Sequence, residues 1–179
     1  KGGSGVIRDG LPISARPPEV ADRAVPGHWE GDLLAGSQNT HIATLVERQT
    51  RFLLLVKLEA RDSETVVAAL AAQVQTLPAQ LRRSLTWDRG AELAAHRRFS
   101  IATDVAVYFC DPRSPWQRGS NENTNGLIRQ YFPKKTDFTT LSDKEIAEVE
   151  RKLNNRPRKR LGFRSPNQVF NEGNLLNQK

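Results

Sequence analysis

Short runs of apolar residues, some alternating with polar ones, dominate the first part of the chain. The segment 27–35 reads GHWEGDLLA, and THIATLVER (40–48) and RFLLLVKLE (51–59) follow it. Only the dipeptide QT separates the second run from the third, which favours an antiparallel hairpin. Two further short runs are SLTWD and DVAVYFC. We therefore expect strands at 27–35, 40–48, 51–59, 84–88 and 104–110.

Other segments have the three- and four-residue spacing of a helix. In 63–76 valine, leucine and alanine recur at that spacing, and Asp62 or Ser63 can cap the first turn. The stretch SDKE is a capping box, in which Ser142 reaches forward and Glu145 reaches back. We expect helices at 63–76, 91–99, 120–132 and 143–155.

The predicted order β-β-β-α-β-α-β-α-α indicates an α/β fold with a mixed five-stranded sheet. The first three strands form an antiparallel meander, parallel strands extend it, and helices flank it. The 179 residues suffice for one domain with a core. Residues 1–25 are rich in Gly, Pro and charge and are predicted to be an N-terminal linker or arm, residues 26–170 the folded core, and residues 171–179 a C-terminal tail. The chain has no methionine, which suggests a fragment that has lost an N-terminal part.

Composition narrows the possible classes of protein. No apolar run approaches the ~20 residues of a membrane helix. The single cysteine, Cys110, cannot form an internal disulfide and fits a reducing cytosol. The net charge is +7, and residues 113–164, with 13 Lys/Arg and 6 Asp/Glu, account for all of the excess. Such a block is typical of a nucleic-acid-binding face, with an ordinary solvated surface as the alternative.

Three carboxylates occupy positions where α/β folds place their chemistry. Asp32 lies in the first strand, Asp88 ends the fourth, and Glu122 opens a helix after a polar loop. Converging carboxylates without His or Cys suit Mg²⁺, and two such ions can activate a nucleophile and stabilise the leaving oxygen of a phosphodiester. Taken singly, solvent exposure, a turn and the helix dipole explain each acid as well. Glu30, on the strand face of Asp32, is an alternative ligand, whereas a capping role is enough to explain Glu92, early in a helix.

The helix that contains Glu122 has two distinct faces. Spacing places Glu122, Asn125, Gly126 and Arg129 on one face, and Leu127, Ile128, Tyr131 and Phe132 on the other, toward the core. Inside a helix, Gly126 costs about 1 kcal/mol relative to alanine. Two alternatives would explain a glycine at this position: the close approach of DNA or metal, or the packing of another helix.

Four stretches together resemble a known family. They are PGHWEGDLLAG (26–36), TWDRGAE (86–92), SPWQRGSNENTNGLIRQYFPK (114–134) and NNRPRKRLGFRSPNQVF (154–170). In order, spacing and flanking residues they resemble the catalytic core of DDE transposases and retroviral integrases, and most of all the IS-thirty insertion-sequence family. The resemblance implies a ribonuclease-H-like fold. It also implies that Asp32, rather than Glu30, joins Asp88 and Glu122 in a catalytic, metal-binding triad.

The resemblance further implies a transposase that cleaves DNA 3′ ends and transfers strands by in-line phosphoryl transfer. The expected cofactor is two Mg²⁺ ions, with Mn²⁺ able to substitute. The expected partners are transposon ends and target DNA, held by a homo-oligomer in the bacterial cytosol or nucleoid, without a membrane. A ribonuclease-H-like nuclease without strand transfer, and a DNA-binding module with an idle active site, are the alternatives.

Basic and aromatic residues near the triad are expected to hold DNA. In related families an arginine stands four residues before the glutamate and a basic residue seven after it; here these are Arg118 and Arg129, although lysine is commoner at the second. A tyrosine often stands where this chain has Pro115. Trp116 is expected to position the substrate, with anchoring of its own loop as the alternative. The predicted DNA contacts are Arg118, Asn125, Arg129, Lys134, Lys135, Arg156, Arg158, Lys159 and Arg160.

Overall fold

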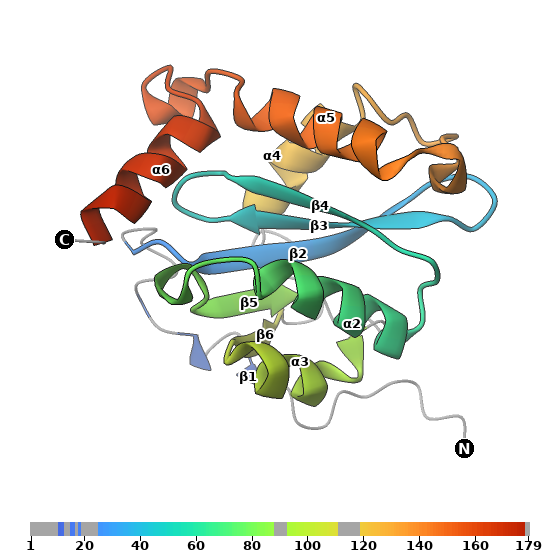
Figure 1. The fold of residues 1–179 in the computed structure, drawn as a ribbon, viewed down its shortest axis with the longest axis horizontal. Coiled ribbons are helices and arrows are strands. Elements are labelled where there is room, and N and C mark those ends of the chain that lie inside the picture. The colour runs from blue at the N-terminus through green and yellow to red at the C-terminus, as the bar shows by residue number, and fades with distance from the viewer. Residues whose placement is uncertain are drawn as a thin grey trace.

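The computed structural model describes residues 11–12, 15–16, 18, 25–87, 93–110 and 119–177; the side chains of 119–122 and 173–177 fall outside this description. A six-stranded sheet lies between two layers of helices, with α4 and α5 on one side and α2 and α3 on the other (Figure 1). The strands are β1 (Leu11–Pro12), β2 (His28–Ala35), β3 (His41–Glu47), β4 (Leu53–Lys57), β5 (Ser84–Trp87) and β6 (Ala106–Phe109). The α-helices are α2 (Ser63–Val74), α3 (His96–Thr103), α4 (Gly119–Ile128), α5 (Asp143–Asn154) and α6 (Pro166–Asn177), and short 3₁₀ turns lie at Ala79–Leu81, Phe138–Thr140 and Lys159–Leu161.

The sheet is mixed, as predicted. Its order is β1-β6-β5-β2-β3-β4, with β2, β3 and β4 antiparallel, and β2, β5, β6 and β1 parallel. The predicted five strands are present. The prediction missed β1, because two residues, Leu11 and Pro12, carry no periodic signal; they pair with Tyr108 and Phe109. Part of the predicted N-terminal arm therefore belongs to the sheet.

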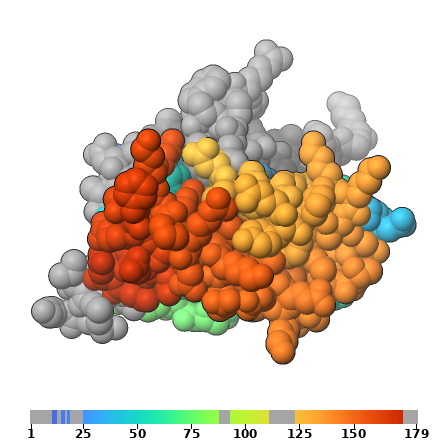
Figure 2. Space-filling model, turned by 90° about the horizontal axis from the view of Figure 1, so that it is seen from above, coloured from blue at the N-terminus to red at the C-terminus, as the bar shows by residue number. Residues whose placement is uncertain are grey.

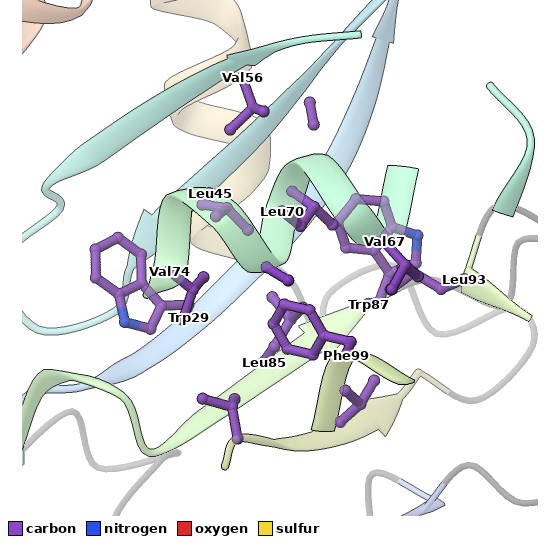
Figure 3. Packing of buried hydrophobic residues seen from close by; sticks show 14 of the residues in the cluster. Trp29, Leu45, Val56, Val67, Leu70, Val74, Leu85, Trp87, Leu93 and Phe99 are labelled. Carbon is purple, nitrogen blue, oxygen red and sulfur yellow. The ribbon is translucent and has the colours of Figure 1, made fainter. Parts of the chain in front are cut away.

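Both faces of the sheet bury apolar side chains. Trp29, Leu45 and Leu85 point from the strands into a cluster with α2 and α3, which Figure 3 shows from close by. The opposite face buries a smaller cluster with α4 and α5, in which Leu34 and Ile128 are members. Burial of these two clusters accounts for the layered arrangement.

The helix ends agree in part with the sequence. Asp62 caps α2 by accepting from the Thr65 backbone N–H at 3.0 Å, and the Ser142 side chain caps α5 by accepting from Glu145 N–H at 3.1 Å. α3 spans His96–Thr103 rather than 91–99, and Asp104, in the left-handed region, ends it. α4 ends at Ile128, short of the predicted 132, because the following residues form tighter turns.

The C-terminal helix α6 was not predicted, and it continues into the segment 171–179 predicted to be a tail. α6 lies beside the β3–β4 hairpin (Figure 1). There the Phe170 ring stacks on Phe52, with centroids 4.1 Å apart, and meets Trp29 edge-on at 6.3 Å. The start of α6 is thereby attached to the domain core.

α5 protects the outer edge of the sheet. Asn154 accepts from the Leu53 N–H and donates to the Leu53 carbonyl, each at 2.8 Å, and Glu150 accepts from the Leu55 N–H at 2.9 Å. Side chains thus replace a neighbouring strand at β4, where an open edge would otherwise invite pairing with another chain.

Candidate active-site face

Alternation along β2 places a row of polar residues on the α4–α5 side of the sheet. His28, Glu30 and Asp32 share this side with Leu34, which packs in the α4–α5 cluster, whereas Trp29 packs on the other side. The first two are buried and Asp32 is half-buried, so the row reaches solvent toward the C-terminal end of the strand.

Asp32 is joined to α4. Its Oδ2 accepts a hydrogen bond from the Asn125 side-chain amide at 3.2 Å, and its Oδ1 accepts from the Leu33 N–H at 2.8 Å. Asn125 lies three residues after Glu122 in α4. Asn125 was predicted to contact DNA; here it bonds to the carboxylate of Asp32.

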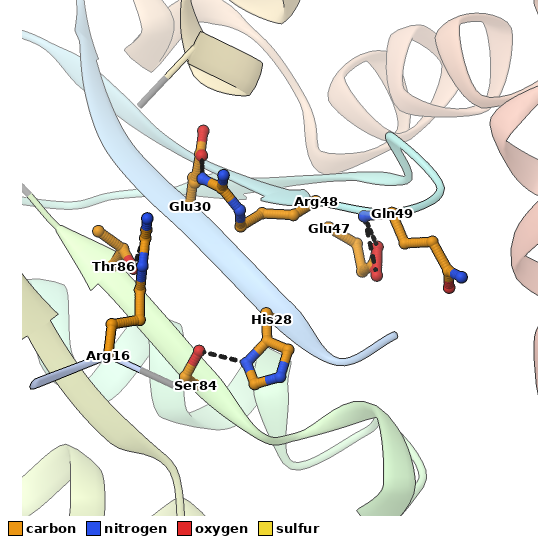
Figure 4. A network of polar contacts seen from close by, with 8 residues as sticks. All are labelled: Arg16, His28, Glu30, Glu47, Arg48, Gln49, Ser84 and Thr86. Atoms are coloured by element: carbon orange, nitrogen blue, oxygen red, sulfur yellow. Dashed lines mark hydrogen bonds and ion pairs between the residues drawn. The ribbon is translucent and has the colours of Figure 1, made fainter. Parts of the chain in front are cut away.

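Glu30 is an internal ion-pair residue. Its side chain is 0% exposed and contacts the guanidinium of Arg48, which is 7% exposed (Figure 4). Burial and this pairing explain Glu30 without a metal. Arg48 follows β3 in the chain, so the sequence did not indicate that the two would meet.

Further polar contacts cover the same face near β5. His28 Nδ1 and Ser84 Oγ lie 2.7 Å apart, and Arg16 donates to Thr86 Oγ1 at 3.3 Å (Figure 4). Arg16 comes from the segment predicted to be a linker, and its position over β5 was not foreseen.

Glu47 is a second buried acid and fixes the turn after β3. It accepts from the backbone N–H of Gly27, Gln49 and Thr50, at 3.3, 2.7 and 2.9 Å. Burial raises the pKa of Glu47, although these donors oppose the rise. It holds the start of β2 against the β3–β4 hairpin.

The predicted faces of α4 are largely confirmed. Ile128 and Phe132 are buried, but Tyr131 is 39% exposed, so its placement toward the core was wrong. A Cβ on Gly126 would meet none of the described residues within 4 Å, so packing against another described helix does not explain this glycine. Arg129 donates to the Ala35 carbonyl at 2.8 Å, and burial lowers the pKa of its guanidinium. Arg129 therefore fastens α4 to the end of β2.

The basic residues after α5 surround a hollow beside α4. We define the basic loop as residues 156–164; its first half and Asn123 and Leu127 of α4 line a hollow of about 370 Å³. Arg156 donates to the Gln130 side chain at 3.1 Å. Burial, with Arg156 and Arg160 close by, lowers the pKa of Arg158. Lys134, Lys135, Lys159 and Arg160 are exposed.

Several predicted residues lie outside the described part of the chain. These are Asp88, Glu92, Trp116 and Arg118, together with the side chain of Glu122. Within the part that is described, no three His, Cys, Asp or Glu side chains form a metal-binding group, and this search does not reach Asp88 or the Glu122 carboxylate. Likewise, none of the described helices is long and apolar enough to cross a membrane.

Comparison with known proteins identifies relatives. The family described as "Integrase core domain" matches residues 22–115. The chain is 53% identical over 178 residues to the transposase InsI for insertion sequence element IS30A of Escherichia coli (strain K12), covering 98% of this chain and 46% of that protein. It is 51% identical over 167 residues to the transposase for insertion sequence element IS1086 of Cupriavidus metallidurans, covering 93% of this chain and 49% of that protein. The chain thus spans about half the length of the curated relatives it matches.

Among solved structures, the catalytic core domain of BIV integrase superposes with a TM-score of 0.64 at 16% identity, covering 86% of this chain and 99% of that one. This likeness confirms the predicted ribonuclease-H-like fold. Because the family match extends over more than half of the chain, the chain belongs to the integrase core domain family, and the resemblance to IS-thirty transposases is confirmed.

Proposed function

We propose that the chain is the catalytic core of a DDE transposase, with Asp32, Asp88 and Glu122 as its metal-binding triad. The observation that carries the proposal is the bond between Asp32 on β2 and Asn125 on α4. Residues three apart in a helix lie on one face. The backbone position of Glu122 is therefore on the side of α4 that faces Asp32.

The register of the parallel strands supports the second aspartate. His28 pairs with Ser84 and Glu30 with Thr86, each 56 positions apart. The same separation joins Asp32 to Asp88, which directly follows the last residue of β5. Continuing this register by two residues would place both carboxylates side by side on the α4–α5 face.

The side chains are of the right kind for a hard divalent cation. Asp32 offers carboxylate oxygens where the polar row reaches solvent, and the buried acid below it, Glu30, is paired with Arg48. Two Mg²⁺ or Mn²⁺ ions held by Asp32, Asp88 and Glu122 would supply Lewis-acid stabilisation of the phosphodiester. Asn125 would hold Asp32 in orientation, as outer-shell partners of metal ligands do.

The reaction is two in-line phosphoryl transfers without a covalent enzyme intermediate. In the first, the oxygen of water bonds to phosphorus as the phosphodiester breaks and the 3′ oxygen leaves as a hydroxyl. In the second, that 3′-hydroxyl bonds to a target phosphorus and displaces the next 3′ oxygen. The basic loop, together with Lys134 and Lys135, would contact DNA phosphates, which provides affinity without sequence information. The transposon ends, the target DNA, the homo-oligomer that holds them and a bacterial cytosolic location belong to the same proposal.

The decisive experiment compares carboxylate variants on a branched oligonucleotide that mimics the strand-transfer product. A site that joins strands also catalyses the reverse reaction. In the reverse reaction the branched DNA is resolved into its separate strands. Asp32→Asn, Asp88→Asn and Glu122→Gln should each abolish this resolution while leaving DNA affinity within a few-fold of wild type. Glu64→Gln, at a 70% exposed side chain on α2, is the matched control and should keep full activity.

Metal binding provides a second readout. Calorimetric titration of Mn²⁺ should give binding that weakens in Glu122→Gln. Retained resolution in the triad variants, or loss of DNA affinity in equal measure, would refute the metal-ligand role. Cleavage without any strand joining would favour the plain nuclease.

A further inference from the structure

Backbone hydrogen bonds hold the basic loop in a defined conformation. Arg158 and Arg164 pair across its base, with the Arg158 N–H donating to the Arg164 carbonyl at 2.9 Å. The Phe163 N–H donates back to the Arg158 carbonyl, also at 2.9 Å. The Arg164 side chain forms an ion pair with Glu172 of α6. These bonds fix the loop backbone on both sides of Phe163.

Phe163 lies beside Arg164 at the base of the loop, and its conformation is unfavourable. Its side chain is 71% exposed, and its backbone φ is +65°. Within the described residues, four large hydrophobic side chains are exposed, and Phe163 is the one among them with a positive φ. A non-glycine residue in this region costs of order 1–3 kcal/mol and persists where the surroundings impose it. Neither packing nor backbone preference explains a phenylalanine here.

The charge around Phe163 indicates the kind of ligand. The basic loop contains five cations and no acid: Arg156, Arg158, Lys159, Arg160 and Arg164. Burial, and after it the neighbouring charges of Arg156 and Arg160, lower the pKa of Arg158, and a bound anion would oppose this lowering. An exposed ring among clustered cations matches the combination by which proteins bind unpaired nucleotides, with cations on phosphates and a ring on a base.

The basic loop borders α4, the helix of the proposed active site. Its first half and two residues of α4, Asn123 and Leu127, border the same hollow, and α4 is the helix that carries Asn125 and Glu122. Figure 2 looks onto this side of the molecule, where yellow residues of α4 are visible between the orange and red surface of the later segments.

We propose that Phe163 is a base-stacking residue that binds an unpaired nucleobase of DNA, while the cations of the basic loop hold the adjacent phosphates. This inference rests on the proposed function, because it assumes a DNA substrate. It adds that the substrate is bound with at least one base unstacked from its helix.

The test measures binding of the chain to two labelled oligonucleotides by fluorescence anisotropy. One is a fully paired duplex, and the other is the same duplex with a single-stranded overhang. Phe163→Ala should weaken binding to the overhang DNA by roughly 5- to 100-fold and leave duplex binding within about twofold. Phe163→Trp should restore binding. Ile101→Ala, at another exposed apolar side chain, is the matched control and should change neither.

Two further measurements separate stacking from charge and from protein contacts. Lys159→Ala should weaken binding to both DNAs alike. It should also reduce the slope of log affinity against log salt concentration by about one. Photo-crosslinking with 5-iododeoxyuridine in the overhang should give an adduct at residue 163. Equal affinity of wild type and Phe163→Ala for the overhang DNA would overturn the inference, as would a change in oligomeric state with unchanged DNA binding. A wild-type chain that binds neither DNA refutes the proposed function; loss of the Phe163 effect alone refutes only the stacking.

Discussion

Replacing Glu30 with glutamine tests whether this acid is structural or a metal ligand. The substitution keeps the shape of the side chain but removes its charge. In the folded chain the Arg48 guanidinium then loses the carboxylate that it contacts. A metal-ligand role instead predicts loss of ion binding with little loss of stability.

The burial of the pair determines the expected magnitude. An exposed ion pair contributes only about 0–1 kcal/mol. Here the two side chains are 0% and 7% exposed, so the value for breaking a buried pair applies, about 3–5 kcal/mol. This is a large share of the ~5–15 kcal/mol that stabilises a typical domain. Replacing both partners, with Glu30→Leu and Arg48→Met, removes both buried charges and should restore most of the loss.

Urea unfolding followed by circular dichroism provides the measurement. With a slope of about 2 kcal/mol per molar, Glu30→Gln should lower the midpoint by about 2 M. The double variant should unfold within about 0.5 M of wild type, and Mn²⁺ binding at low urea should persist in Glu30→Gln. The reasoning is refuted if Glu30→Gln loses less than about 1 kcal/mol, or if the separate losses of Glu30→Leu and Arg48→Met simply add in the double variant.

Three other substitutions test neighbouring features. Asn125→Ala removes the amide that holds Asp32 and should lower strand resolution by about 10- to 100-fold with an unchanged urea midpoint, since such positioning groups act on the ligand. Gly31→Ala places a Cβ 2.3 Å from the Trp87 ring, so it should destabilise the fold by at least ~1–3 kcal/mol. It should also lower resolution of the branched DNA, because Trp87 ends β5 just before the second aspartate. Burial raises the pKa of Glu150, so the folded state binds its proton more tightly than the unfolded state. Unfolding free energy should therefore fall as pH rises from the ordinary glutamate pKa to the raised one, and Glu150→Gln, which can still accept the β4 N–H, should flatten this fall.

The sequence predicted the elements whose signal is local. Continuous aliphatic runs gave β3 and β4 within two residues at either end, and Ser142 fixed the start of α5. The start of α6 was readable too. Ser165 and Gln168 form a reciprocal capping box, with bonds of 2.8 and 3.2 Å, and Pro166 occupies the first helical position. This signal was missed because the segment 154–170 was interpreted through its charge and its family resemblance, and not as the start of a helix.

Features that depend on distant partners could not be predicted. Alternation placed Glu30 and Asp32 on one face, but which acid is buried depends on Arg48, which reaches β2 from beyond β3. Similarly, the exposure of Tyr131 depends on where α4 ends, and the left-handed Phe163 depends on backbone bonds across the basic loop. Asp88 and the Glu122 carboxylate remain predictions from the sequence and the register.

The polar row on β2 explains why one acid of the pair suits chemistry and the other does not. Glu30 and Asp32 project from the same face of the same strand, two positions apart, so the local strand pattern does not distinguish them. They differ in position along the sheet: at Glu30 both neighbouring strands are paired, to Val46 and Thr86, and the side chain is covered. At Asp32 the described pairing is with β3 alone, and the carboxylate is half-buried beneath α4. A fully buried carboxylate needs a fixed countercharge, which Arg48 supplies, whereas a half-buried one can exchange water for a cation. The proposed reactive position therefore follows from burial, because Asp32 keeps contact with solvent and Glu30 does not.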